Sequence, residues 1–261
     1  MREQCFWKTE ISPLLIFIIL QSSFIVNCSM KKLTLILSVI FIFILNSECE
    51  NKTMAMNQSN SNSIRYVALG DSYTICEGAS ERESWPVNLS AHCVADKIPV
   101  QLIANPSRTG WTTQNLIDNE LSVFDESNAD AVTLLIGVND WVQKVETETF
   151  RTNLQFILDH LQSKLKKKEN ILLITIPDFG VTSSGKNYSG GRDISNGISE
   201  FNEVIKAEAK KRNLPIVDIF EVSKQMGIDN SLVAEDGLHP SAKEYAIWEK
   251  MILPVFEKMI R

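Results

Sequence analysis

Short apolar runs alternate with amphipathic helical patterns along most of this chain. Five of the runs have the length of strands, and apolar residues recur every three or four positions in the segments between them. The expected strands cover residues 64–69, 100–104, 131–136, 171–176 and 215–219. Such alternation is typical of βα units, in which helices connect neighbouring parallel strands. It predicts an α/β fold, a three-layer α/β/α sandwich with about five parallel strands.

The helical patterns occupy the intervals between the expected strands. They predict helices over residues 85–95, 113–122, 148–167, 194–211 and 241–258. The run 131–136 is almost continuously apolar, which is typical of a central strand covered on both faces. Right-handed crossovers leave few topologies for such a sheet, and the flavodoxin-like strand order is the simplest. We expect residues 64–261 to form one domain.

The N-terminal segment carries the features of a bacterial secretory signal. Met30-Lys31-Lys32 precedes the apolar run 33–45, which is followed by polar residues and Cys49. A basic start before a short apolar run is typical of a signal for export. Neither this run nor the earlier apolar segment, 13–20 continued by 24–26, reaches the roughly 20 residues of a membrane-spanning helix. We therefore interpret residues 1–48 as an over-extended start followed by a signal, with translation beginning at Met30. Export to the periplasm or to the cell envelope is expected.

Cys49 occupies the position of the modified cysteine in a lipoprotein signal. Glu48 before it departs from the small residue that this position usually holds, so lipidation and simple cleavage nearby both remain open. The mature chain would begin near Cys49, which could tether it to a membrane. Residues 49–63 are polar and lack periodicity, so we expect a flexible tether there.

Charge and cysteine usage exclude several classes of protein. The formal net charge is −6, whereas a nucleic-acid-binding face normally shows a basic excess. The one basic cluster, residues 164–168, ends a helical pattern, where lysines complement the helix dipole. The five cysteines form no CxxC motif and have no histidine pair nearby, so we expect no metal site. Cys76 and Cys93 could form a disulfide in an exported protein or remain free thiols.

A serine, a glycine and an asparagine follow the first three expected strands. Ser72 follows the first strand within Gly70-Asp71-Ser72-Tyr73, Gly110 follows the second, and Asn139 follows the third. Ligands of open α/β sheets bind at this carboxyl edge. Gly110 can bring a backbone N–H close to a bound group, and an asparagine amide can stabilise an oxyanion by about 3–4 kcal/mol. Taken singly, each of these residues could instead form a turn or a helix cap.

A further pair, Asp236 and His239, precedes the last helical pattern. Residues three apart on a tight turn can face one another, so Asp236 can accept from one imidazole nitrogen while the other faces a serine. His92 and His160 lie inside helical patterns without such a neighbour, and we interpret them as packing or surface residues. Nucleophile, base, orienting acid and oxyanion donors together make up the set that acyl transfer needs.

These motifs resemble the four blocks of the SGNH (GDSL-type) esterase and lipase superfamily, and the resemblance covers residues 64 to about 258. It implies that Ser72 is the nucleophile and a backbone oxyanion donor, with Gly110 as second backbone donor and Asn139 as side-chain donor. It also implies that His239 is the base and Asp236 its partner, and that Asp71, which matches the family too, is structural. No metal or organic cofactor is implied.

The resemblance predicts a serine hydrolase, expected to be monomeric, that cleaves carboxylic esters of short acyl chains through an acyl-enzyme. Its substrate could be a small-molecule, lipid or glycan ester, and a carbohydrate O-deacetylase, a lysophospholipase or a thioesterase remain alternatives. An inactive binding module on the same scaffold is the alternative from another class, against which the intact motif residues speak. Trp111 and Trp141 could line the acyl pocket or pack in the core.

Overall fold

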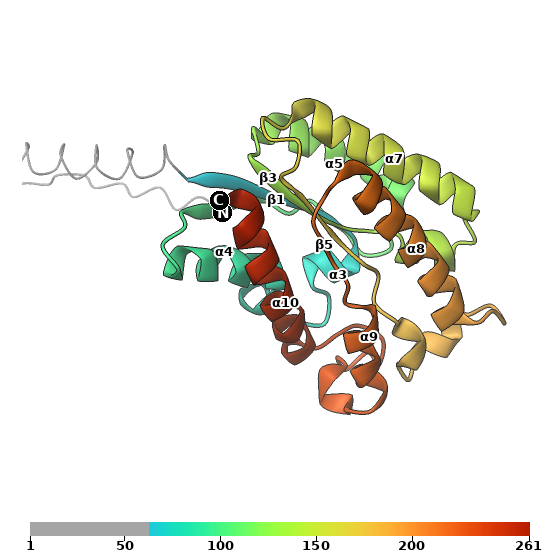
Figure 1. Cartoon of the computed structure of the whole chain (residues 1–261). Helices are drawn as coiled ribbons and strands as arrows, with labels where there is room; N and C mark the ends of the chain where they lie inside the picture. Colours follow the sequence, from blue (N-terminus) through green and yellow to red (C-terminus); the bar gives the residue numbers. More distant parts are fainter. Residues whose placement is uncertain (1–62) are drawn as a thin grey trace, which may run out of the picture. The chain divides into compact units, whose positions relative to one another are not determined.

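The computed structural model describes residues 63–261 (Figure 1). The expected signal, the start at Met30, the lipidated Cys49 and the tether up to residue 62 lie outside the described residues.

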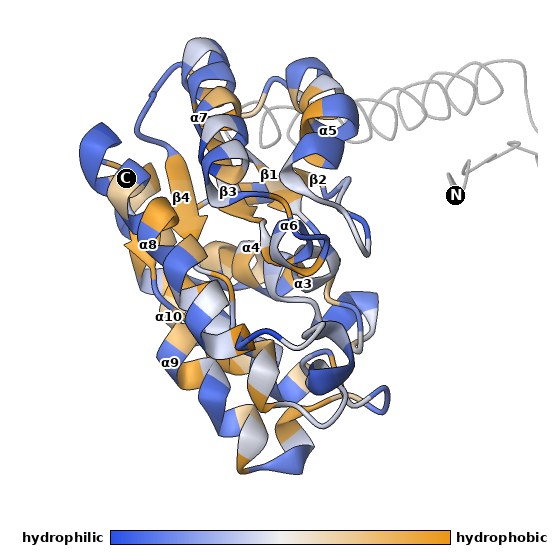
Figure 2. Cartoon of the chain, turned by 90° about the vertical axis from the view of Figure 1, so that its right-hand side faces the viewer, coloured by the Kyte–Doolittle hydropathy of each residue, from blue (hydrophilic) through white to orange (hydrophobic). Residues whose placement is uncertain are grey.

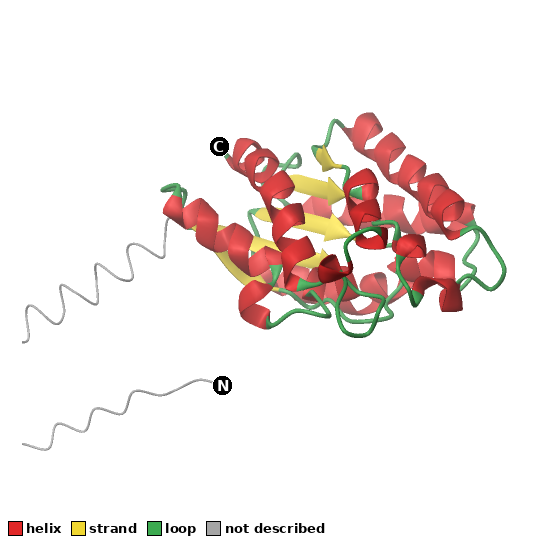
Figure 3. Cartoon of the chain, turned by 90° about the horizontal axis from the view of Figure 1, so that it is seen from below, coloured by secondary structure: helices red, strands yellow, loops and turns green. Residues whose placement is uncertain are grey.

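Residues 63–261 form one sheet of five parallel strands. In chain order these are β1 (Ile64–Gly70), β2 (Val100–Ala104), β3 (Ala131–Leu135), β4 (Ile171–Ile174) and β5 (Ile216–Val217). Their spatial order is β2-β1-β3-β4-β5, and Figure 3 shows the strand arrows pointing the same way. The α/β fold and its flavodoxin-like order are therefore confirmed. The apolar run of β3 is the central strand, and all five of its residues are buried.

Strands β4 and β5 are shorter than the sequence predicts, because side chains at their ends accept the hydrogen bonds that a neighbouring strand would otherwise accept. The Ile176 N–H donates to Asn202 Oδ1 at 2.7 Å, and the Ile219 N–H donates to Thr175 Oγ1 at 2.9 Å. Pro215, at the expected start of β5, has no N–H for a ladder bond.

Helices cover both faces of the sheet (Figure 1). The longer ones are α4 (Trp85–Ala95), α5 (Thr113–Ser127), α7 (Thr147–Lys164), α8 (Ile194–Arg212) and α10 (Ala242–Ile260). Helices α4 and α10 lie side by side on one face, and α5, α7 and α8 cover the other. Helix α5 continues past the predicted end at residue 122 and stops where Asn128 adopts a left-handed conformation. None of the helices in residues 63–261 combines the length and the hydropathy needed to cross a membrane.

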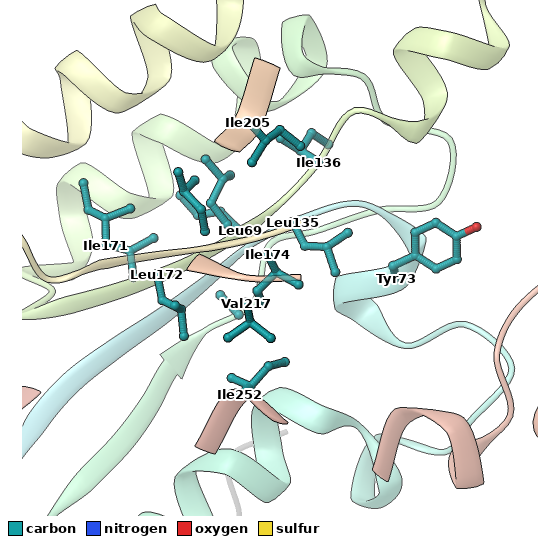
Figure 4. Packing of buried hydrophobic residues seen from close by; sticks show 14 of the residues in the cluster. Leu69, Tyr73, Leu135, Ile136, Ile171, Leu172, Ile174, Ile205, Val217 and Ile252 are labelled. Atoms are coloured by element: carbon teal, nitrogen blue, oxygen red, sulfur yellow. The ribbon is translucent and has the colours of Figure 1, made fainter. Parts of the chain in front are cut away.

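The core lies between the sheet and the two helix layers. The strands carry its aliphatic residues, and in Figure 2 they are coloured as hydrophobic while the outer face of α7 is largely hydrophilic. Figure 4 shows Ile205 of α8 and Ile252 of α10 reaching the strand residues from opposite faces. Three short helices follow strand ends: α3 (Ser72–Ile75), α6 (Val138–Val142) and α9 (Phe220–Ser223). The first two begin just past the carboxyl edge of β1 and β3.

The two remaining histidines have carboxylate partners that sequence spacing did not reveal. His92 is exposed, and its Nδ1 lies 2.9 Å from Glu249 Oε1. His160 Nε2 lies 2.8 Å from Asp125 Oδ1. Each pair joins two helices: His92 is exposed while its partner Glu249 is buried, and the His160–Asp125 pair is partly buried, as packing or surface residues can be.

Cys76 and Cys93 are both buried and free of a disulfide. Burial raises the pKa of both thiols, that of Cys93 to about 12, so neither is expected to be reactive.

Candidate active site

Ser72 lies on a rigid turn between strand and helix. Asp71 caps α3: its Oδ1 accepts from the Tyr73 N–H at 3.0 Å, and its backbone carbonyl accepts from the N–H groups of Thr74 and Ile75. Ser72 is the first residue of α3, so its N–H has no carbonyl partner within that helix. Its side chain is largely buried. The turn thus presents both the hydroxyl and the backbone N–H of Ser72 at the edge of the sheet. Asp71 caps the short helix, which is the structural role expected of it.

The register of the sheet brings Asn139 to the same edge. Gly70 at the end of β1 pairs with Leu135 at the end of β3, and α6 begins three residues later. The Asn139 Nδ2 donates to the Trp111 carbonyl at 2.9 Å. A primary amide has two N–H groups, so this bond orients the side chain and leaves the second N–H for another acceptor.

Gly110 lies beside α6 on the loop that follows β2. Its φ of +82° is in the left-handed region that favours glycine, and a Cβ there would meet nothing within 4 Å. Its carbonyl accepts from the Gln143 Nε2 at 3.2 Å. Together with the bond between Asn139 and Trp111, this contact ties the loop to the end of α6. Gly110 is exposed and does not line the cavity described below.

The Asp236–His239 pair is formed as its spacing predicts. The His239 Nδ1 lies 2.6 Å from Asp236 Oδ2, and Asp236 Oδ1 accepts from the N–H groups of Leu238 and His239 at 2.8 and 2.9 Å. Although partial burial acts to raise it, the pKa of Asp236 is held below its ordinary value by these hydrogen bonds from His239 and Leu238. The ionised carboxylate keeps the proton on Nδ1, which leaves Nε2 as the acceptor.

Ser72 and His239 line one small cavity of about 40 Å³. The residues around it are Ser72, Tyr73, Val138, Asn139, Val142, Phe179, Tyr188, Leu238 and His239. The structure therefore brings together the serine, the histidine with its aspartate, and the asparagine that the sequence singled out. No hydrogen bond within residues 63–261 joins Ser72 Oγ to His239 Nε2; such bonds often tighten only when substrate binds.

The two tryptophans beside the site do not line this cavity. Trp141 is buried, with its ring covered by the Arg192 guanidinium at 3.8 Å from its centroid and by the edge of Phe179. Trp111 is half-buried under Arg108. Packing therefore accounts for Trp141. Aromatic walls of the cavity come instead from Phe179 and Tyr188, which belong to the long loop 178–192. This loop is rich in glycine and serine, and no motif in the sequence marks its two aromatic residues.

Two buried carboxyl groups hold the turn that carries Ser72. Glu120 of α5 is fully buried, and its Oε2 accepts from the Gly70 N–H at 3.0 Å. Burial raises the pKa of Glu120 to about 9, against the lowering effect of the Gly70 bond, and raises that of Asp71 to about 8. Glu120 lies within an ordinary helical pattern, and nothing in the sequence indicates its hydrogen bond with the Gly70 N–H.

Asp140 anchors a neighbouring helix. Its Oδ2 accepts from the Thr113 N–H at 2.8 Å, in the first turn of α5, so it caps that helix rather than its own. Burial raises the pKa of this carboxyl group. Among residues 63–261 no three His, Cys, Asp or Glu side chains are grouped so that they could hold a metal ion.

This fold and this grouping of side chains are those of serine hydrolases built on a flavodoxin-like sheet. The model of the GDSL-like lipase/acylhydrolase family matches residues 68–247, and the chain belongs to that family. The resemblance seen in the four motifs is thereby confirmed.

Several known proteins are similar to this chain. A multidomain esterase of Ruminococcus flavefaciens is 34% identical over 125 residues, which are 47% of this chain and 14% of that protein's length. The crystal structure of TesA has a TM-score of 0.61 at 19% identity, covering 75% of this chain and 99% of that one. Axe2, an acetylxylan esterase from Geobacillus stearothermophilus, has a TM-score of 0.58 at 17% identity, covering 75% and 93%. At these identities the two structures show a shared fold.

The raised pKa of Glu120 predicts a pH-dependent effect of Glu120→Gln. In the folded protein the pKa of Glu120 is about 9, above the ordinary 4.5, so the folded state holds a proton that the unfolded chain releases. The stability of the wild type is therefore lowered progressively as pH rises from about 4.5 to about 9. Glutamine keeps an acceptor for the Gly70 N–H but does not titrate. We expect the variant to gain stability relative to the wild type between about pH 5 and pH 8.

Urea unfolding of both proteins at the two pH values measures this difference. Glu126→Gln, on the exposed side of the same helix, is the matched control for the loss of one carboxyl group. If the free energy of unfolding differs between wild type and Glu120→Gln by the same amount at pH 5 and at pH 8, Glu120 is ionised in the folded protein and the prediction is wrong.

Proposed function

We propose that this protein hydrolyses carboxylic esters of short acyl chains through an acyl-enzyme formed on Ser72. One observation carries the proposal: Ser72, the carboxylate-paired His239 and the Asn139 side chain face the same cavity. A hydroxyl beside an oriented imidazole can be activated as a nucleophile. Membership of the GDSL-like lipase/acylhydrolase family supports the same chemistry.

The proposed reaction proceeds in two steps. His239 Nε2 takes the proton of Ser72 Oγ as this oxygen attacks the ester carbonyl carbon, and Asp236 stabilises the imidazolium that forms. The oxyanion accepts from the Ser72 N–H and from the free N–H of Asn139. The Gly110 N–H, which the family resemblance implies as a further donor, belongs to an exposed residue outside the cavity lining. His239 then protonates the departing alcohol. In the second step His239 deprotonates a water molecule, which attacks the acyl-enzyme and releases the acid and Ser72.

The size of the cavity supports a preference for an acetyl group. Its volume of about 40 Å³ is far below the several hundred Å³ of a site for a larger ligand. Its apolar walls include Val138, Val142 and Phe179. A long acyl chain of a lysophospholipid or a thioester would extend beyond so small a cavity.

Deacetylation of a carbohydrate is the second candidate function. Solved structures of similar fold include acetylxylan esterases, and an acetyl ester of a sugar would place the same small acyl group in the cavity. Tyr188, a wall of this cavity, is 45% exposed, so its ring also offers an aromatic surface to the rest of a bound substrate.

Substitution of the proposed nucleophile tests the mechanism. We expect Ser72→Ala to lower the turnover of p-nitrophenyl acetate by about a thousandfold or more, because no covalent intermediate can form. The wild type, and not the variant, should be labelled by a serine-directed fluorophosphonate, which also separates an active hydrolase from an inactive binding module.

Ser122→Ala, an exposed serine of α5, is the control and should keep full activity. Thermal unfolding of Ser72→Ala near the wild-type temperature would show an intact fold. A variant that retains wild-type turnover would rule out Ser72 as the nucleophile.

The cavity size predicts a steep dependence on acyl-chain length. We expect kcat/KM to fall by about tenfold or more from p-nitrophenyl acetate to the octanoate, because overfilling a packed site costs about 1–3 kcal/mol. Tyr188→Ala removes one wall and should raise the butyrate-to-acetate ratio of kcat/KM by about tenfold. Ile228→Ala, another exposed hydrophobic residue that does not line the cavity, should leave that ratio unchanged. An unchanged ratio in Tyr188→Ala would remove Tyr188 from the acyl site.

We also propose that the protein is exported and anchored through a lipidated Cys49, which the basic and apolar pattern of residues 30–45 supports. When the full chain is expressed in a bacterium, its mass should correspond to a start at Cys49 plus lipid. It should partition into the detergent phase of Triton X-114, and Cys49→Ser should remain in the aqueous phase. A wild-type protein that begins at another residue and stays in the aqueous phase would contradict the anchor.

A further inference from the structure

The loop 178–192, here called the strap, connects the end of β4 to α8 across the candidate site. It contains two short 3-10 turns, Phe179–Val181 and Gly185–Tyr188, and contributes Phe179 and Tyr188 to the cavity walls. Hydrogen bonds attach it to the elements on both sides of the cavity.

One side is the turn that carries Asp236 and His239. The Ser184 N–H donates to the Gly237 carbonyl at 2.8 Å, and the Ser184 Oγ donates to the Asp236 carbonyl at 2.9 Å. The Ser183 Oγ donates to the Gly237 carbonyl at 3.2 Å. The approach favours glycine, because Gly237 has a φ of +70° and a Cβ there would lie 2.6 Å from Ser183 Oγ, which would have to turn away.

The other side is α6, the short helix that carries Asn139. Arg192 Nη1 donates to the Trp141 carbonyl at 2.7 Å, and its Nη2 donates to the Val142 carbonyl at 3.2 Å. These carbonyls lie at the end of α6, where that of Trp141 also accepts from the Lys144 N–H at 3.1 Å, and a cation there complements the helix dipole. The Arg192 Nε donates to the Ser189 carbonyl at 3.1 Å, so the same side chain holds the end of the strap.

Arg192 also fixes the helix through a side chain two residues from Asn139. Its guanidinium lies over the Trp141 ring at 3.8 Å from the centroid. Behind the indole there is no space, because a Cβ on Gly197 of α8 would lie 1.9 Å from Trp141 Nε1. Helix α6 has only five residues, so a displacement of Trp141 would displace Asn139 with it.

We propose that Arg192 is a positioning residue for the ester hydrolysis proposed above, on which this inference rests. It fixes α6 at its carboxyl end, so that the free N–H of Asn139 points at the developing oxyanion. Through the strap, it also links α6 to the turn that carries His239. Asn139 and His239 must act on the same tetrahedral intermediate, and Arg192 fixes the position of Asn139 relative to His239.

Arg192→Ala tests this role by separating turnover from binding. We expect kcat for p-nitrophenyl acetate to fall about tenfold to a hundredfold with KM changed by less than about threefold, because Asn139 acts mainly on the charge of the transition state. The rate is expressed per site labelled by a fluorophosphonate, so a loss of folded protein does not lower it. Addition of millimolar guanidinium ion should restore part of the lost kcat.

Arg151→Ala is the matched control, an arginine whose surface ion pair with Glu148 contributes little; it should keep wild-type kcat. Should Arg192→Ala fail to fold, Arg192→Lys decides the question, because lysine keeps the charge but cannot cap two carbonyls and stack on the indole at once. Its kcat should fall at unchanged KM.

Wild-type kcat per labelled site in the folded Arg192 variant would overturn the positioning role while leaving the proposed function intact. A wild-type protein that neither turns over esters nor takes the label would instead overturn the proposed function itself.

Discussion

The parallel register of β1 and β3 is the constraint on which the site depends. Because Gly70 pairs with Leu135, the turn with Ser72 and the helix with Asn139 leave the sheet side by side. A slip of one residue would move one of them by about 3.3 Å along the strand. That distance is as long as a hydrogen bond, so the proposed nucleophile and oxyanion donor could no longer act on one carbonyl group. The burial of both faces of β3 is what makes such a slip costly.

The sheet does not place the third component, the Asp236–His239 turn, which precedes α10 and belongs to no strand. Contacts between loops place it instead. The strap donates three hydrogen bonds to it, and the edge of the Tyr73 ring packs against His239 at 6.0 Å between centroids. Tyr245 of α10 donates to the Glu77 carbonyl just after α3, so the helix that follows the turn is bonded to the segment that follows Ser72.

Buried acids hold the segments around Ser72, and this has an energetic cost. Glu120 and Asp71 each satisfy a backbone N–H of the turn, but Glu120 Oε1 and Asp71 Oδ2 are buried without a partner in the described part of the chain. Burial raises the pKa of both groups, so each is more stable protonated than charged. Stability is given up here for a fixed turn geometry, as is common at functional sites.

The sequence by itself determined the order and type of the elements and singled out Ser72, Asn139, Asp236 and His239, because periodicity and residues just past strand ends are local signals. It did not reveal where β4 and β5 end, which Asn202 and Thr175 decide, nor the carboxylate partner of exposed His92. Glu120, Arg192 and the size of the cavity also came only from the tertiary structure. Each of these depends on contacts between segments far apart in the chain, and no pattern of neighbouring residues encodes which distant side chain fills a given space.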